Sequence, residues 1–218
     1  MQKTIVTRMV ESKQNAPHFY ITNEVDMTEA VAFRKSINEA QPEGQGVSFN
    51  DIVVKAVALA LKAYPSVNSS YQNNQFIRHK AINIGIAVAI PDGLVVPVLR
   101  NADQKGLSQI AKDAKDIIDK ARNRKLSVSE MEGSTFSITN LGMYDVDQFA
   151  GILNTPNGGI LAVGAITKKP VVKNDQIVIA DRMRLTISCD HRVVYGADAA
   201  LFLREVKRIL EHPALLAL

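Results

Sequence analysis

Apolar residues recur every three or four positions in five stretches of the chain, which is the spacing of a helix that buries one face. The clearest stretch is residues 48–64, where Ser48 and Asp51 have the spacing of a capping box and Pro65 ends the pattern. This pattern predicts a helix. Weaker versions of it predict further helices at residues 5–10, 27–38, 107–121 and 197–212.

Other stretches alternate apolar with polar or small residues, which is the period of a strand. Residues 82–90 place five branched apolar side chains on one face and predict one strand. Residues 134–140 differ, because Thr135, Ser137 and Thr139 fill one face of the predicted strand with hydroxyl groups. Further strands are expected at residues 18–25, 94–99, 158–166, 176–181 and 184–190.

No internal repeat, low-complexity tract or long linker interrupts these elements, so the pattern predicts a single α+β domain over residues 1–218. Hydrophobic residues make up 46% of the chain and charged residues 22%, the balance of an ordinary globular protein. The net charge of +4 is small and the basic residues are scattered, which argues against nucleic-acid binding. We interpret the densest basic cluster, residues 120–125, as a helix end whose charge complements the helix dipole.

The sequence also argues against a membrane segment and a disulfide framework. Lysines interrupt the apolar stretch at residues 52–64, so no part of the chain is expected to enter a membrane. The single cysteine, Cys189, cannot form an intrachain disulfide and fits a reducing compartment. We therefore expect a cytoplasmic protein or, in a eukaryote, one of the mitochondrial matrix.

Four histidines, His18, His79, His191 and His212, are the side chains best suited to acid–base chemistry at neutral pH. No pair has the spacing of a zinc site and no glycine-rich phosphate loop occurs, so no metal and no nucleotide cradle are expected. His191 stands apart because it follows a predicted strand and enters a turn, where a side chain can reach a cleft. Cys189, two residues earlier, is either a nucleophile or a buried packing residue, and we favour packing.

The segment around His191, DHRVVYGADAA, resembles the DHRxxDG signature of the dihydrolipoamide acyltransferases of 2-oxoacid dehydrogenase complexes. Four more segments resemble that family in the same order: APHFYITNEVDMTE, GIAVAIPDGLVVPVLRNAD, GSTFSITNLG and ILEHPALLAL. The resemblance spans essentially the whole chain. Several matching blocks in order are far more specific than one short motif.

The resemblance implies a fold like that of chloramphenicol acetyltransferase, with a mixed β-sheet flanked by helices. It also implies trimers with active sites between subunits, and larger cubic or icosahedral cores. We expect the apolar tail, residues 213–218, to dock on another subunit or on the chain's own core. The family's lipoyl and peripheral-subunit-binding domains are missing here, so we expect an excised catalytic core. The 2-oxoacid decarboxylase and dihydrolipoamide dehydrogenase components would bind through those absent domains.

The resemblance also assigns roles to single residues. His191 matches the general base that takes the proton from the thiol of coenzyme A or dihydrolipoamide. Thr139 stands where the family has a serine that donates to the oxyanion, while Asn140 and Gly164 match places where the pantetheine arm of coenzyme A passes. The substrates implied are coenzyme A and a lipoamide supplied by a lipoyl domain, without a metal. Acetyl is the acyl group we expect first, ahead of branched-chain and succinyl groups.

Tyr195 departs from the signature, because the family has an aspartate at this position. That carboxylate is understood to pair with an arginine and hold the site's geometry, and a neutral tyrosine cannot balance the charge. Three explanations stay open: a natural variant whose hydroxyl still hydrogen-bonds, an engineered change that weakens catalysis, or a core whose catalysis has lapsed. We therefore expect an acyltransferase, with a weakened or inactive structural scaffold as the alternative. A third hypothesis is acetyl transfer to a small free acceptor such as chloramphenicol.

Overall fold

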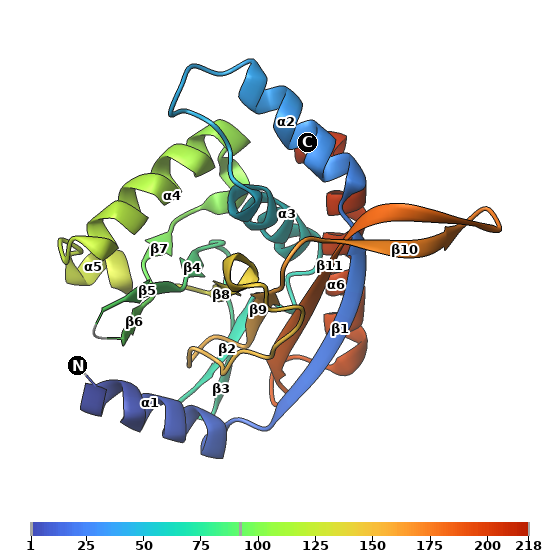
Figure 1. The fold of residues 1–218 in the computed structure, drawn as a ribbon. Coiled ribbons are helices and arrows are strands. Elements are labelled where there is room, and N and C mark those ends of the chain that lie inside the picture. The colour runs from blue at the N-terminus through green and yellow to red at the C-terminus, as the bar shows by residue number, and fades with distance from the viewer. Residues whose placement is uncertain (1, 92, 218) are drawn as a thin grey trace.

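The computed structural model describes residues 2–91 and 93–217, and a mixed β-sheet of seven strands forms its centre (Figure 1). The strand order is β1-β11-β9-β8-β4-β7, and β10 pairs with β11 outside this path. β8 is parallel to β9 and to β4, and the other pairs are antiparallel. The strands are His18–Asp26 (β1), Ile84–Ile86 (β4), Val98–Leu99 (β7), Phe136–Asn140 (β8), Gly159–Val163 (β9), Thr167–Lys173 (β10) and Gln176–Asp190 (β11).

Helices cover one face of the sheet and build the main hydrophobic core with it (Figure 1). All five predicted helices are confirmed, and the first begins before its predicted start. Ser48 Oγ accepts from the Asp51 N–H at 3.2 Å, and the Asp51 carboxylate accepts from the Ser48 N–H at 2.8 Å, which is the predicted capping box. The helices are Gln2–Asn15 (α1), Thr28–Glu39 (α2), Phe49–Ala63 (α3), Leu107–Arg122 (α4), Val128–Met131 (α5) and Gly196–Glu211 (α6), with 3-10 turns Ala102–Gln104 (η1), Gly142–Tyr144 (η2) and Pro213–Ala217 (η3).

The strand predictions are right in position but wrong in continuity at three places. The predicted strand at residues 94–99 is two short strands, β6 and β7, which belong to different sheets. Residues 82–90 form two strands, β4 and β5 (Val88–Ile90), because the Ala87 N–H donates to the Ile138 carbonyl and β5 then leaves the sheet to pair with β6 (Gly93–Val95). Residues 176–181 and 184–190 form the single strand β11, since the intervening residues continue the pairing with β1. The sequence pattern missed β10 and the hairpin of β2 (Ser69–Gln72) and β3 (Gln75–Arg78), whose residues are largely polar.

The other face of the sheet is covered by the segment between β8 and β9, which α1 contacts through a hydrogen bond from Ser12 Oγ to the Leu153 carbonyl at 2.7 Å. Leu153 of this segment is buried together with Ala16 and Ile160. The hydroxyl face of β8 meets the same segment, because Ser137 Oγ accepts a hydrogen bond from the Asn157 amide at 3.0 Å. Thr135 contacts a different segment, because its hydroxyl accepts from the Asn83 N–H at 3.1 Å, so the row of hydroxyls serves at least two separate polar contacts.

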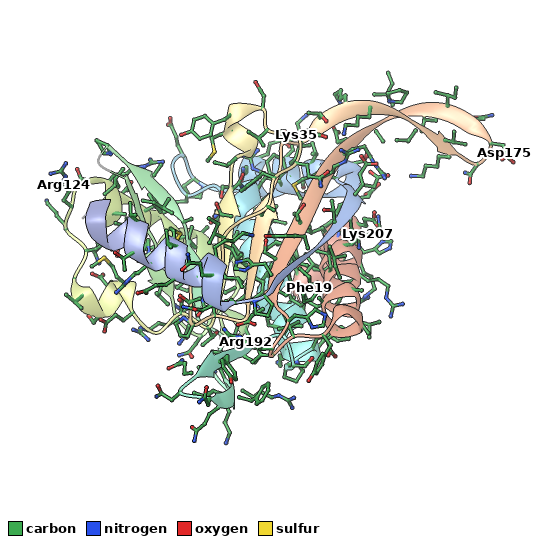
Figure 2. The ribbon with its side chains drawn as sticks, turned by 90° about the horizontal axis from the view of Figure 1, so that it is seen from below. Phe19, Lys35, Arg124, Asp175, Arg192 and Lys207 are labelled. Atoms are coloured by element: carbon green, nitrogen blue, oxygen red, sulfur yellow. The ribbon has the colours of Figure 1, made fainter. Side chains whose placement is uncertain are left out.

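The β10–β11 hairpin forms an arm that projects beyond the rest of the molecule (Figures 1 and 2). Its outward face carries three large apolar side chains that are more than three-quarters exposed: Val172, Ile177 and Ile179. α1 lies on another side of the body, and its Val6 and Val10 are exposed as well. Exposed apolar patches of this kind are typical of surfaces that contact another protein.

The apolar tail docks on the chain's own core, which is one of the two predicted outcomes. Pro213 and Leu216 of η3 are buried, and η3 packs against α2, α3 and α6. The last residue of the tail, Leu218, lies outside the described residues. No helix in residues 2–91 and 93–217 combines the length and the apolar character that a bilayer crossing requires.

Candidate active site

His191 lies directly after β11, in the turn that leads to α6. The start of β1 fixes this turn, because His18 pairs with Asp190 and the Pro17 carbonyl accepts from the His191 N–H at 3.0 Å. The exposed imidazole lies against the ring of Phe19, with ring centroids 4.7 Å apart. Within the described part of the chain no hydrogen bond or ion pair engages the imidazole nitrogens, so they are open to a substrate or a second chain.

The turn that carries His191 is held from inside by a buried carboxylate. Asp190 is 3% exposed and accepts from the Arg192 guanidinium at 2.7 Å and 3.0 Å, and from the Arg192 N–H at 3.0 Å. This pairing with Asp190 raises the pKa of Arg192. The guanidinium also lies over the Tyr71 ring, 4.3 Å from its centroid, at the same end of the sheet as Phe19 (Figure 2). The Asp190 carboxylate thus pairs with Arg192 and not with the His191 imidazole.

Tyr195 occupies the N-cap position of α6, with extended backbone angles φ −95° and ψ 157° and no capping hydrogen bond from its side chain. The side chain is 58% exposed, and its ring meets that of His191 edge to face at 6.2 Å between centroids. Because this position is exposed in the single chain, an aspartate here would not form a buried ion pair within that chain. The backbone angles are those of a helix N-cap. An aspartate or asparagine side chain can accept a capping hydrogen bond there, and tyrosine cannot.

Cys189 is fully buried, and burial raises the pKa of its thiol far above the ordinary range. The prediction that it packs in the core is confirmed. His18 is structural, because its Nδ1 lies 2.7 Å from the Ala16 carbonyl and its Nε2 accepts from the Leu153 N–H at 3.2 Å. His79 lies 2.9 Å from Ser70 Oγ, and burial lowers its pKa. Within residues 2–91 and 93–217 no three acidic, histidine or cysteine side chains gather as a metal site requires.

Thr139 and Asn140 end β8 at the opposite end of the sheet from His191. Both are partly exposed. The Asn140 side chain closes the following turn, because its Oδ1 accepts from the Gly142 N–H at 2.8 Å. Its Nδ2 lies 3.4 Å from Oδ1 of Asn50, at the start of α3. These contacts place one hydroxyl and one amide at the rim of the sheet.

Gly164 follows β9 beside this turn, in a place where only glycine fits. A Cβ atom on Gly164 would lie 2.2 Å from the Asp147 carbonyl oxygen, and one on Gly142 would lie 2.7 Å from the Gly164 carbonyl oxygen. The Asp147 carboxylate accepts hydrogen bonds from Lys169 Nζ and Arg184 Nη1, each at 2.8 Å. The hydrogen bond from Lys169 lowers the pKa of Asp147. Three segments thus meet backbone to backbone beside Asn140.

Two cavities open at this end of the sheet and share Asn140 and Met143. One has a volume of about 370 Å³ and includes Thr139 in its lining. The other, of about 320 Å³, includes Gly164 and is otherwise lined mostly by apolar side chains: Phe49, Val53, Val163, Ile166 and Met183. A larger cavity of about 1010 Å³ between α2, β10 and η3 contains none of the candidate residues.

The structure does not bring Thr139 and His191 together within one chain. Through Ala162 of β9, Thr139 aligns with Thr186 of β11, two strand spacings or about 10 Å away. His191 lies further along by five residues, or about 17 Å at the rise of a strand. The Cα atoms of the two residues are therefore about 19 Å apart. A site that uses both needs a second copy of the chain.

Sequence reasoning missed two residues that the geometry brings into the site. Phe19 packs on the imidazole, and Met143 lines both cavities. Phe19 was not predictable, because the register of β1 on β11 joins positions far apart in sequence. Met143 directly follows the family-like segment GSTFSITNLG, but an exposed residue in a turn belongs to no periodic pattern that would mark it.

Comparison with known sequences places this chain among proteins of one family. Residues 1–218 match the model of the 2-oxoacid dehydrogenases acyltransferase (catalytic domain). The dihydrolipoyllysine-residue acetyltransferase component of the pyruvate dehydrogenase complex of Rhizobium meliloti is 43% identical, over 98% of this chain and 49% of that protein. The chain spans about half the length of the curated relatives it matches.

Solved structures agree with the sequence comparison. The cubic core of the pyruvate dehydrogenase multienzyme complex has a TM-score of 0.95 at 36% identity, covering 100% of this chain and 90% of the other. Azotobacter vinelandii dihydrolipoamide acetyltransferase, studied for the catalytic role of a serine, a histidine and an asparagine, has a TM-score of 0.93 at 36% identity with the same coverage. Chloramphenicol acetyltransferase is 15% identical over 94% of both chains with a TM-score of 0.57, which confirms the predicted fold.

Proposed function

The chain belongs to the catalytic domains of the 2-oxoacid dehydrogenase acyltransferases, and from this premise we propose that it transfers an acetyl group between dihydrolipoamide and coenzyme A. The acetyl group is favoured over branched-chain and succinyl groups because the Rhizobium meliloti relative is an acetyltransferase. Since the family model matches residues 1–218 as a catalytic domain, the lipoyl group would come from a lipoyl domain outside these residues. The decarboxylase and dehydrogenase components would bind through a peripheral-subunit-binding domain, also outside these residues.

The observation that carries the proposal is the spacing of three residues. In the Azotobacter vinelandii enzyme the named serine and histidine are 52 positions apart, and the asparagine follows the histidine by 4. Thr139, His191 and Tyr195 have the same spacing in this chain. Thr139 keeps the serine hydroxyl, and Tyr195 replaces a residue that is already uncharged in that relative. The lack of charge at Tyr195 is therefore no argument against activity.

The proposed reaction needs two groups from the protein. The His191 imidazole takes the proton from the thiol of coenzyme A as the sulfur attacks the carbonyl carbon of acetyl-dihydrolipoamide. The Thr139 hydroxyl donates a hydrogen bond to the oxyanion of the tetrahedral intermediate. When the intermediate collapses, the bond from carbon to the lipoyl sulfur breaks, and that sulfur receives the proton from the imidazolium. No acyl-enzyme forms, and the imidazole ends neutral.

Because about 19 Å separates Thr139 from His191 in one chain, the site would form between two copies. The imidazole would come from one copy, and Thr139, Asn140 and Gly164 from its neighbour. The apolar cavity beside Gly164 suits the pantetheine arm, with Asn140 available to its amides. The exposed apolar faces of α1 and the β10–β11 arm suit the contacts of a trimer, and the cubic core among the relatives supports a larger assembly.

The second candidate function is a structural core with little catalysis. It is favoured by Tyr195, whose ring meets the imidazole where the Azotobacter vinelandii enzyme has a small amide side chain. Such a core would keep the surfaces for assembly and lose the environment of the base.

Steady-state acetyl transfer from acetyl-coenzyme A to dihydrolipoamide tests the proposal, with His191→Ala and Tyr195→Asn as variants. We expect activity in the unsubstituted chain and a loss of about 100 to 10,000-fold in His191→Ala. A gain in Tyr195→Asn would identify Tyr195 as an obstacle beside the base. If the unsubstituted chain and Tyr195→Asn are both inactive with acetyl, isobutyryl and succinyl donors, the chain is a scaffold.

A further inference from the structure

Met143 is a large apolar side chain that the single chain leaves in the open. It is 69% exposed, at the centre of η2, four residues after Thr139. It lines both cavities that share Asn140, the one that includes Thr139 and the one that includes Gly164. A methionine held at such a junction has water on most of its surface until a ligand or another chain covers it.

The backbone beneath Met143 is fixed on both sides. The Leu141 N–H donates to the Val163 carbonyl at 3.1 Å, and the Tyr144 N–H donates to the Leu141 carbonyl at 3.0 Å. Gly142 packs against the Gly164 carbonyl so closely that no side chain fits between them. The position of the Met143 Cα atom is therefore set by the sheet. Only its unbranched, polarisable side chain can adapt to what lies against it.

The chemistry at Thr139 determines what lies against Met143. A carbonyl oxygen bound to the Thr139 hydroxyl lies about 3 Å from it, so the first carbons of the acyl chain lie within roughly 5 Å of the same oxygen. Thr139 and Met143 both line one cavity, of about 370 Å³, at this end of the sheet. Resting on the proposed function, we infer that Met143 is the wall against which the acyl chain packs, and that it limits acyl length to short chains.

The inference predicts a change of selectivity and not only of rate. Met143→Ala removes the wall and makes room for a longer chain, whereas Met143→Leu keeps a side chain of similar volume. The ratio of kcat/KM for butyryl-coenzyme A to that for acetyl-coenzyme A should rise at least about 10-fold in Met143→Ala and stay near the original ratio in Met143→Leu. Met131→Ala is the matched control, since Met131 is 40% exposed on α5 and lines neither cavity.

A binding measurement separates this inference from the proposed function. The S-ethyl and S-butyl thioethers of coenzyme A cannot transfer an acyl group, so their dissociation constants, measured by calorimetry, do not depend on turnover. Met143→Ala should favour S-butyl over S-ethyl by about 10-fold relative to the original chain. This result would support the inference even if acetyl transfer were absent.

Two outcomes would overturn the inference. An equal loss for both acyl donors, with an unchanged preference between the thioethers, would give Met143 no part in acyl selection. A fall in assembly mass by light scattering in Met143→Ala, again without a change in selectivity, would make it a contact between copies.

Discussion

Thr139 and His191 lie at opposite ends of one sheet, and the two ends are built differently. At the Thr139 end, three backbone segments pack so closely around Gly164 and Gly142 that no Cβ atom fits, and two cavities open beside them. At the His191 end, an ion pair between the buried Asp190 and the partly exposed Arg192 holds a turn whose imidazole is exposed. The first end has preformed cavities, whereas the second presents a single exposed imidazole.

The largest effect expected from this difference is complementation between two inactive variants. Thr139→Ala lacks the oxyanion donor and His191→Ala lacks the base, so each alone should lose about 100-fold or more in activity. If each site takes one group from each copy, co-assembled mixtures contain sites with both groups intact. An equal mixture that assembles at random should recover about a quarter of the original activity, because two independent choices must both be right.

The mixture should be unfolded and refolded together and assayed beside the two variants mixed only after refolding. Recovery in the first sample alone supports a site shared between copies. No recovery, in assemblies that light scattering shows to be mixed and intact, would mean that one chain supplies both groups, against the separation of about 19 Å.

The second effect concerns the packed end alone. Gly164→Ala places a Cβ atom 2.2 Å from the Asp147 carbonyl oxygen, a backbone atom that cannot rotate away. We expect the free energy of unfolding to fall by about 3 kcal/mol, with loss of coenzyme A binding. Gly196→Ala is the control at the other end, because nothing lies within 4 Å of a Cβ atom there. Equal free energies of unfolding for the two variants, measured in urea, would show that the backbone around Gly164 rearranges to accept a Cβ atom at little cost.

The sequence was informative where the signal is local. The spacing of Ser48 and Asp51 predicted the start of α3, and the segments around Thr139 and His191 indicated the family from sequence alone. It was uninformative where the answer depends on pairing between distant strands. Neither the contact of Phe19 with the imidazole nor the separation of Thr139 from His191 can be read from spacing, because both follow from the order of strands in the sheet. The roles of these residues in catalysis stay predictions.

The smallest expected effect sharpens what Tyr195 does at the open end. The residue sits at the N-cap of α6 with suitable backbone angles but no side-chain oxygen in reach of the first turn. Tyr195→Asn should let the amide oxygen accept from that turn and raise the free energy of unfolding by about 1 kcal/mol relative to Tyr195→Ala, measured in urea at equal chain concentration. Tyr195→Phe removes only the hydroxyl and should leave the free energy of unfolding nearly unchanged.

If Tyr195→Asn is no more stable than Tyr195→Ala, the position does not act as a cap. An effect of Tyr195→Asn on turnover must then come from the space beside the imidazole. If Tyr195→Asn is more stable, a polar residue here positions the helix that follows the base, and tyrosine has given up that contact for an edge-to-face one with His191.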